Sequence, residues 1–462
     1  MLVFLESPMT TTALLAPAPS PGIPQLSGNP LALVRQMRRD PLALMQRASR
    51  ECGDLAAMRI GPTRVLALSH PRHVEPLLVS GASVWTKQTR GQAVLRLILG
   101  RGLLTAEGEE WRRNRRIANP AFARRAIGGF AQTMHRATLD LAADWQGRSG
   151  PQDLARDMNH LALRIAGETL FGADVDSARQ VVSHGLDVVL GDFLRLTTLP
   201  WPWMARLPTP RNRRLWRALG QLDRVVNGIV AARRQVEEQP PDLLGMLMSA
   251  VDEDGQGLSD RQLRDEVLTM LLAGHETTAN ALAWTLYLLG RHPQAQERVA
   301  EEAAGLGEGI PDPAKLSFTR AVLNESMRLY PPAWITSRAA SEDTELDGQP
   351  VARGTFAFLS PYVLHRHPEI WPDPEAFLPE RWVEERPLGV DERPVPKDAF
   401  MPFGAGPRKC IGSHFAMMEA TIVLATLLWG FRLSLVPGHE VRPQASITLR
   451  PEGGVVMSLR RR

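Results

Sequence analysis

A lone cysteine in a glycine-rich loop near the C-terminal end of the chain is the residue best suited to chemistry. Cys410 lies in the run Phe403–Gly412 (FGAGPRKCIG). Three glycines let this backbone pass close to a flat, bulky ligand. Arg408 and Lys409 favour a thiolate, and so does a helical pattern over 413–429 that puts Cys410 near a helix N-terminus. The loop therefore predicts a thiolate ligand of haem iron. A buried free cysteine in a tight turn is the alternative interpretation.

A second group stands in the middle of the longest helical pattern, at Ala273–Thr278 (AGHETT). Gly274 removes side-chain bulk where a helix approaches a ligand. Thr277 can bond the carbonyl one turn back and open the helix to a small ligand or water. Glu276 beside this alcohol can relay protons to a buried site. The alternative is an irregular core helix with Glu276 in solvent. A zinc-protease motif is excluded because its fifth position is Ala279.

Two further charged groups have a structural or a binding interpretation. Glu325 and Arg328 share one helix face, where such a pair is usually a surface ion pair of little energetic value. Arg381, in a rigid segment bracketed by aromatic residues, could complete a buried network with Glu325. We expect that network to be structural.

The basic cluster at 111–116 (WRRNRR) has three interpretations. It is a solvated helix face, a docking patch for an acidic partner, or a clamp on an anionic ligand. Trp111 and Arg115 are four residues apart, so their side chains can converge on one carboxylate. The remaining arginines of the cluster then point elsewhere.

The elements that must hold these residues are mostly helical. Apolar periodicity predicts helices over 31–50, 108–146, 152–172, 174–196, 210–237, 259–289, 293–306 and 317–330. Strand-like patterns cover 55–60, 64–68, 333–360 and 430–460, and proline-rich irregular chain covers 361–400. Ser259 is the expected N-cap of the longest helix, which has apolar residues on several faces and should run through the core. The fold class is mainly α with a minor β region.

Composition narrows the class of protein. The 462 residues carry a formal net charge of only +4, which does not favour nucleic-acid binding. Two cysteines cannot form a disulfide framework, so we expect a reducing, cytoplasmic location. The apolar run at Met1–Leu5 is too short to span a membrane, and Met9 is an alternative start. A proline-rich stretch makes residues 1–29 an expected flexible leader.

Together these motifs resemble the cytochrome P-450 family of haem-thiolate monooxygenases, from about residue 30 to the end. The resemblance rests on Trp111-x-x-x-Arg115, Ala273-Gly274-x-Glu276-Thr277, Glu325-x-x-Arg328, Pro379-Glu380-Arg381-Trp382 and Phe403–Gly412. Trp382 stands where Phe is common in the family. The resemblance implies a single domain over 30–462, of the soluble bacterial type. Haem b would lie between the long central helix and the helix that follows the cysteine loop.

The resemblance also implies roles, position by position. Cys410 would be the axial iron ligand; Trp111, Arg115, Arg338 and Arg408 would bind the haem propionates; Phe403 and Gly412 would belong to the haem-binding loop. Thr277 and Glu276 would deliver protons during dioxygen activation, beside an oxygen pocket lined by Ala273 and Gly274. Glu325, Arg328 and Arg381 would form the structural network.

The implied reaction is hydroxylation or epoxidation of a lipophilic molecule, with electrons that come indirectly from NAD(P)H. A ferredoxin or flavodoxin with its reductase would dock on Arg112, Arg113, Arg116 and Lys409, for which a solvated basic face is the alternative. A peroxide-driven peroxygenase and a non-catalytic haem protein are the other functions considered, and neither needs the Glu276–Thr277 pair. We expect a monomer without a transmembrane span.

Substrate contacts are expected in variable, mostly apolar segments. The expected pocket residues are Leu97, Ile98, Ala273, Trp334, Ile335 and Thr448. They favour a terpenoid, fatty acid, steroid or polyketide-like substrate. The segment 199–204 is either a lid that touches membrane lipid or a packed interhelical loop.

Overall fold

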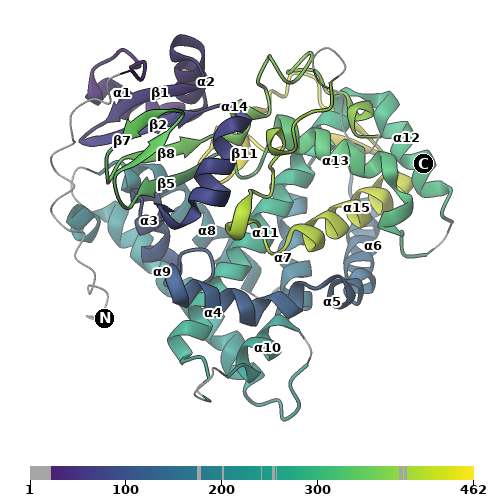
Figure 1. The fold of residues 1–462 in the computed structure, drawn as a ribbon. Helices are drawn as coiled ribbons and strands as arrows, with labels where there is room; N and C mark the ends of the chain where they lie inside the picture. The colour runs from purple at the N-terminus through teal and green to yellow at the C-terminus, as the bar shows by residue number, and fades with distance from the viewer. Residues whose placement is uncertain are drawn as a thin grey trace.

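The helix α11 (Asp260–Arg291) runs through the middle of the molecule (Figure 1). Its N-terminus is closed by a capping box: the Ser259 hydroxyl accepts the Gln262 N–H at 3.3 Å, and the Gln262 side chain accepts the Ser259 N–H at 3.0 Å. Every residue from Thr278 to Leu289 is buried. The predicted N-cap and the predicted core position of this helix are both confirmed.

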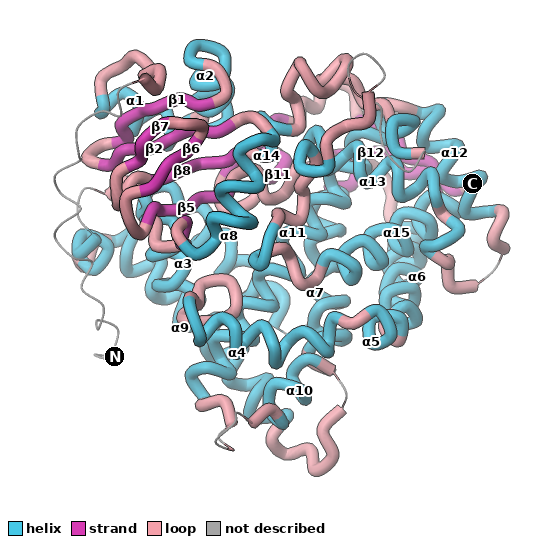
Figure 2. Tube along the Cα trace, viewed as in Figure 1, coloured by secondary structure: helices cyan, strands magenta, loops and turns pink. Residues whose placement is uncertain are grey.

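The structure is a computed structural model and describes residues 22–173, 178–199, 202–240, 242–251, 255, 257–307, 309–383, 389 and 393–462. Helices make up most of this part of the chain, which forms one domain (Figures 1 and 2). Besides α11 they are α1 Pro30–Arg39, α2 Pro41–Cys52, α3 Arg90–Leu99, α4 Gly108–Ala118, α5 Arg124–Gly128, α6 Ala131–Gly147, α7 Leu154–Leu170, α8 Arg179–Thr197, α9 Pro210–Arg233, α10 Leu243–Ser249, α12 Pro293–Ala304, α13 Ser317–Leu329, α14 Pro361–Leu364 and α15 Ser413–Gly430.

The strands gather mainly at one corner of the molecule (Figure 2). They are β1 Leu55–Ile60, β2 Thr63–Leu68, β3 Trp85–Thr86, β4 Gln152–Asp153, β5 Thr336–Ala340, β6 Thr344–Leu346, β7 Gln349–Val351, β8 Phe356–Leu359, β9 Phe431–Leu435, β10 Arg442–Ala445, β11 Leu449–Glu452 and β12 Val456–Arg461. The largest sheet has the order β1-β2-β8-β5-β3, with only β2 and β8 parallel. The expected fold class, mainly α with a minor β region, is confirmed.

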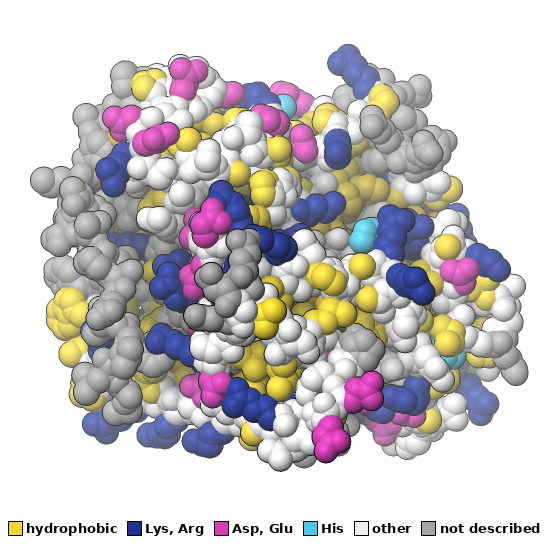
Figure 3. All heavy atoms as spheres, turned by 60° about the horizontal axis from the view of Figure 1, so that its bottom comes forward, with side chains coloured by type: hydrophobic (Ala, Val, Ile, Leu, Met, Phe, Trp, Pro, Cys, Tyr) yellow, Lys and Arg dark blue, Asp and Glu magenta, His cyan; other side chains and the backbone are white. Residues whose placement is uncertain are grey.

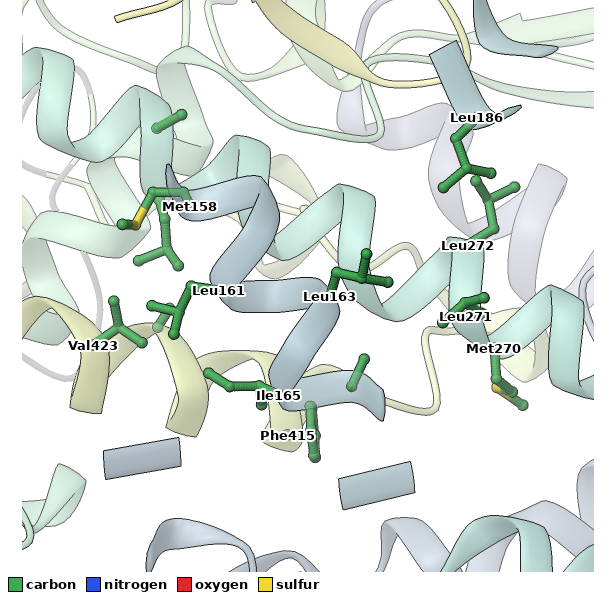
Figure 4. Packing of buried hydrophobic residues seen from close by; sticks show 14 of the residues in the cluster. Met158, Leu161, Leu163, Ile165, Leu186, Met270, Leu271, Leu272, Phe415 and Val423 are labelled. Carbon is green, nitrogen blue, oxygen red and sulfur yellow. The ribbon is translucent and has the colours of Figure 1, made fainter. Parts of the chain in front are cut away.

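The helices α7 and α15 show how the main core forms. In Figure 4 Leu161 and Ile165 of α7 face Val423 and Phe415 of α15, and each of the four is at most 4% exposed. Each fully buried aliphatic side chain of this kind contributes about 1.5–3 kcal/mol. Of the described helices, only α15 is apolar and long enough to cross a membrane by length and composition, and 61% of it is buried inside the protein.

Prolines divide two stretches that periodicity alone joins. Pro41 begins α2 because it has no N–H to bond, and the Asp40 carboxylate caps the same helix by accepting the Ala43 N–H at 3.0 Å. Pro120 likewise falls in the break between α4 and α5. The short helices α3 and α10 were not predicted. At the N-terminal side, Ile23 and Leu26 are buried beside β1, where the Leu26 N–H donates to the Ala57 carbonyl at 2.8 Å.

Candidate active site

A cavity of about 530 Å³ separates α11 from the cysteine loop. Its wall includes Cys410 from the loop and Thr277 from α11, although the two are 133 positions apart in the sequence. Side chains from α3, α4, α8 and β5 close the remaining sides. The structure therefore brings the two groups of chemically suited residues to one space.

The backbone of the cysteine loop has the shape that its glycines predict. Gly404 and Gly406 have φ of +72° and +67°, in the left-handed region that favours glycine. A Cβ at Gly406 would lie 1.9 Å from the Leu78 carbonyl oxygen, so no side chain fits there. The Cys410 N–H donates to the Phe403 carbonyl at 2.8 Å and closes the turn. The exposed surface of Cys410 opens into the cavity.

The protein alone does not make Cys410 a thiolate. Burial raises the pKa of the thiol above its ordinary value, while the Gly412 N–H, Arg115 and Lys409 act in the opposite direction and only partly offset it. Of the basic pair, Lys409 does lower the thiol pKa as expected, but burial outweighs it, so the pair does not by itself produce a thiolate. A bound metal ion would deprotonate the thiol outright.

A cluster of cations lies at another part of the same wall. Lys87, Arg115, Arg338 and Arg408 all line the cavity. Lys87 directly follows β3, whose pairing with β5 (Thr86 opposite Ala339) brings it toward Arg338. Burial and the nearby charges of Arg338 and Arg408 lower the pKa of Lys87 to about 7. Lys87 was not predicted, because a single lysine carries no motif.

Burial and mutual repulsion also lower the pKa values of two arginines of this cluster. Burial and Arg408 lower the pKa of Arg338 to about 10, and burial together with Arg115 lowers that of Arg408 to about 10. Arg408 bonds Glu107 at 2.7 Å and lies 4.0 Å from the Trp111 ring, yet its Nη1 is buried without a partner. The carboxylate of Glu107 is paired with only one of the four cations that line this wall. The excess positive charge therefore favours an anionic ligand.

The donor set fits haem. A thiol that borders the cavity suits the iron, and four lining cations with one unpartnered nitrogen, Arg408 Nη1, suit the two propionates. Arg115 also donates to the Lys409 carbonyl at 3.0 Å and so supports the cysteine loop. Of the residues predicted to contact haem, Trp111, Arg115, Arg338, Phe403, Arg408, Cys410 and Gly412 all line the cavity.

On α11, Ala273 and Thr277 face the cavity one turn apart. The Thr277 hydroxyl donates to the Ala273 carbonyl at 2.7 Å, the bond expected of a helical threonine. Gly274 also borders the cavity, but a Cβ there would meet Leu170 of α7 at an ordinary 3.6 Å. At Gly274 the helix α11 therefore lies close to α7, and not only to the cavity where a ligand was expected.

Glu276 is buried, which contradicts the alternative that placed it in solvent. Arg450 of β11 donates to both of its oxygens, at 2.5 and 2.8 Å, and Thr448 and Asn280 donate to Oε1 at 2.8 and 3.0 Å. Burial alone would raise the pKa of this carboxyl, but Arg450 outweighs burial and lowers it to about 2. Arg450 was not predicted, since it lies in a β region 174 residues away.

The predicted network behind the cysteine loop is also brought together. Glu325 accepts bonds from Arg328 at 2.8 and 2.9 Å, from Arg381 at 3.4 Å and from the Trp382 indole at 2.8 Å. Glu325 and Arg328 are completely buried. The pair is therefore no surface ion pair, and Trp382 uses an indole N–H that the more common Phe lacks.

The expected substrate contacts are partly placed at the cavity. Ala273, Trp334, Ile335 and Thr448 line it, whereas Leu97 and Ile98 are not among its lining residues. The reason is the helical phase of α3, which turns Gly91, Gln92 and Leu95 to the cavity instead. Of the segment 199–204, Pro200 and Trp201 lie outside the described residues, and Trp203 is 55% exposed.

Known proteins resemble this chain over most of its length. The family model for cytochrome P450 matches residues 18–457. Cyclooctat-9-en-7-ol 5-monooxygenase of Streptomyces melanosporofaciens is 36% identical over 94% of this chain and 92% of its own length. Cyclooctatin synthase of the same organism is 35% identical over 93% of both chains. Pentalenene oxygenase of Streptomyces avermitilis is 36% identical over 90% of this chain and 91% of its own.

The chain belongs to the cytochrome P450 family. It is a haem-dependent monooxygenase, an oxidoreductase that incorporates oxygen into lipophilic substrates.

Proposed function

We propose that this monooxygenase oxidises a terpenoid, by hydroxylation or epoxidation. The main support is the cavity wall above Cys410, where apolar side chains such as Leu95, Phe193 and Ile335 come from separate segments. Relatives named as a cyclooctat-9-en-7-ol 5-monooxygenase and a pentalenene oxygenase favour terpenoids over fatty acids, steroids and polyketides. A binding titration of the ferric protein with representatives of these four classes tests the choice. Tighter binding of a fatty acid or steroid than of every terpenoid would overturn it.

The chain's own residues have distinct tasks in this proposal. Cys410 holds the iron, and Lys87, Arg115, Arg338 and Arg408 bind and orient the haem through its propionates. The bound haem supplies dioxygen activation and the transfer of one oxygen atom to the substrate. Apolar residues of α3 and α8 exclude water. Thr277 and Glu276 hold and move protons at the α11 wall.

The role of Thr277 has a matched control on the same helix. Thr285 donates to the Ala281 carbonyl at 2.7 Å, as Thr277 does to Ala273, but Thr285 does not line the cavity. We expect Thr277→Ala to lower the rate of product formation about 100-fold, the scale of general acid–base catalysis, while dioxygen consumption continues. Product and dioxygen are measured together with a reductase system.

Thr285→Ala should keep the wild-type ratio of product to dioxygen consumed. Normal product formation in Thr277→Ala would show that Thr277 is dispensable for proton delivery. Product formed with peroxide alone at the wild-type rate would favour a peroxygenase.

We also propose that electrons reach the site from NAD(P)H through a separate ferredoxin or flavodoxin and its reductase. Arg112, Arg116 and Lys409 are exposed, Arg113 is half-buried, and Arg112 already pairs with Glu109. On the lower face of the molecule, which carries α4 and α10, basic side chains are interspersed with acidic ones (Figure 3). A monomeric, cytoplasmic protein remains a prediction.

A further inference from the structure

Three charged side chains form a row from the molecular surface to the cavity wall. Arg450 Nη1 lies 2.9 Å from Asp187 Oδ1 on α8, and its Nε and Nη2 bind Glu276 on α11. The side chains are 64% exposed at Asp187, 22% at Arg450 and 2% at Glu276. Arg450 thus joins a solvated carboxylate to a buried one that borders the cavity.

Arg450 is the counter-charge of Glu276 among the described residues. Thr448 and Asn280 donate neutral hydrogen bonds to the same carboxylate. His275, next to Glu276, is fully buried; burial and Arg450 lower its pKa to about 4, against the opposing effect of Glu276, so it is uncharged at neutral pH. Of the described residues, Asp187 and His160 of α7 are the other titratable groups that act on His275.

The effect of losing Arg450 follows from the chemistry of buried carboxyls. Burial favours the neutral acid, and neutral donors offset burial only in part. A bidentate arginine–carboxylate contact is among the strongest that a protein provides. Without Arg450, the carboxyl of Glu276 would take up a proton at neutral pH.

We infer that Arg450 is a positioning residue for the proton step. It holds Glu276 ionised and fixed against β11, so that this carboxylate receives protons from water on the Asp187 side and passes them to the cavity at Thr277. One proton enters from solvent, binds a Glu276 oxygen and leaves toward Thr277, after which the ion pair with Arg450 forms again. The inference rests on the proposed role of Glu276 and Thr277 in proton delivery.

The first test uses infrared spectra of the resting haem-loaded protein at neutral pH. In the difference spectrum against the wild type, which already holds other buried acids such as Glu419, Arg450→Met should show one additional C=O stretch of a protonated carboxylic acid. The double variant Arg450→Met/Glu276→Gln should lose this band, which assigns it to Glu276. Arg450→Lys keeps a positive charge and should show a much weaker band or none. Asp187→Asn is the matched control, because it leaves the inner ion pair intact and should show no band.

The second test follows turnover in the same proteins. We expect Arg450→Met to form about ten-fold less product per dioxygen consumed, with substrate affinity changed less than two-fold, and Arg450→Lys to recover part of the loss. Absence of the acid band in Arg450→Met, or an unchanged product yield despite the band, would overturn the inference.

The two proposals can fail separately. If the wild type oxidises no terpenoid but oxidises another lipophilic substrate, the terpenoid proposal fails and the Arg450 inference is tested with that substrate. If Arg450→Met does not fold, Arg450→Lys carries both measurements: a wild-type product yield together with a full acid band would then contradict the inference.

Discussion

At the level of single residues, unbalanced positive charge is the property that most restricts what the cavity can hold. Lys87, Arg115, Arg338 and Arg408 border one space, and Glu107 alone among the described acids is ion-paired to this group. Buried like charges are tolerated when an anion neutralises them. The charge pattern therefore fits a dianionic cofactor independently of the cysteine.

Lys87 provides a direct test of this charge balance. If Lys87 binds a haem propionate as proposed, Lys87→Gln removes a charge-assisted hydrogen bond worth about 1.5–3 kcal/mol, so haem should pass to a haem-scavenging protein about 10- to 100-fold faster. The transfer is followed by visible absorbance. Lys315→Gln, at an exposed lysine outside the cavity, should transfer haem at the wild-type rate. Equal rates in both variants would show that Lys87 does not bind the propionates.

The pH dependence of this contact has a definite sign. In the proposed contact, haem propionates would raise the pKa of Lys87 above the value of about 7 that burial, Arg338 and Arg408 give it in the protein alone. The contact is strongest where Lys87 is protonated and is lost as pH rises through its raised pKa. Haem transfer from the wild type should accelerate in that alkaline range, and Lys87→Gln should lack this acceleration.

At the level of elements, one buried carboxylate joins α13 to the irregular chain around residues 376–382. Glu325 on α13 joins its own helix to the segment that carries Arg381 and Trp382. Nearby, Glu380 pairs with Arg298 at the surface, with side chains 59% and 49% exposed. The two glutamates thus differ in burial and in partners: Glu325 is completely buried and accepts several hydrogen bonds, whereas Glu380 has one ion pair at the surface.

We expect the variants Glu325→Ala and Glu380→Ala to differ strongly in their free energy of unfolding. Glu325→Ala leaves the completely buried Arg328 without its counter-charge, so the free energy of unfolding should fall by about 3–5 kcal/mol. Glu380→Ala should change it by less than about 1 kcal/mol, as exposed ion pairs do. Urea unfolding of both variants measures the difference. Similar midpoints would mean that the network contributes little to the fold.

At the level of the whole molecule, buried acids make stability depend on pH. Glu266 of α11 is 2% exposed and accepts the Leu103 N–H at 2.9 Å, which ties the loop before α4 to the central helix. Burial, with smaller contributions from Asp265 and Glu110, raises its pKa from 4.5 to about 7. Glu419 on α15 is buried too, and burial raises its pKa well above the ordinary value.

The sign of the Glu266 effect follows from proton binding. Below pH 4.5 both the folded and the unfolded carboxyl are protonated, and between pH 4.5 and about 7 only the folded one is. The free energy of unfolding therefore falls through this window by an amount on the order of 3 kcal/mol, and the contribution is constant at higher pH. Glu266→Gln should lose this part of the pH slope, as measured by urea unfolding at about pH 5 and about pH 8. Glu342→Gln, at an exposed site, should keep the wild-type slope, and an unchanged slope in Glu266→Gln would contradict the assignment.

The sequence by itself determined the elements and the residues that have motifs. Periodicity located α11 and its cap because these depend on neighbouring residues, and glycine spacing located the Cys410 loop because its backbone needs positive φ. The sequence could not show which face of α3 borders the cavity, because that depends on what the helix packs against. Leu95 lines the cavity and Leu97 does not.

Only the tertiary structure decided which charged side chains meet and which of them are protonated. Lys87 lies beside Arg338 through strand pairing, and Arg450 reaches Glu276 from a β strand 174 residues away. Protonation follows burial and through-space neighbours, which no local pattern records. For the same reason the basic pair beside Cys410 suggested a thiolate, whereas burial in the fold raises the pKa of that thiol.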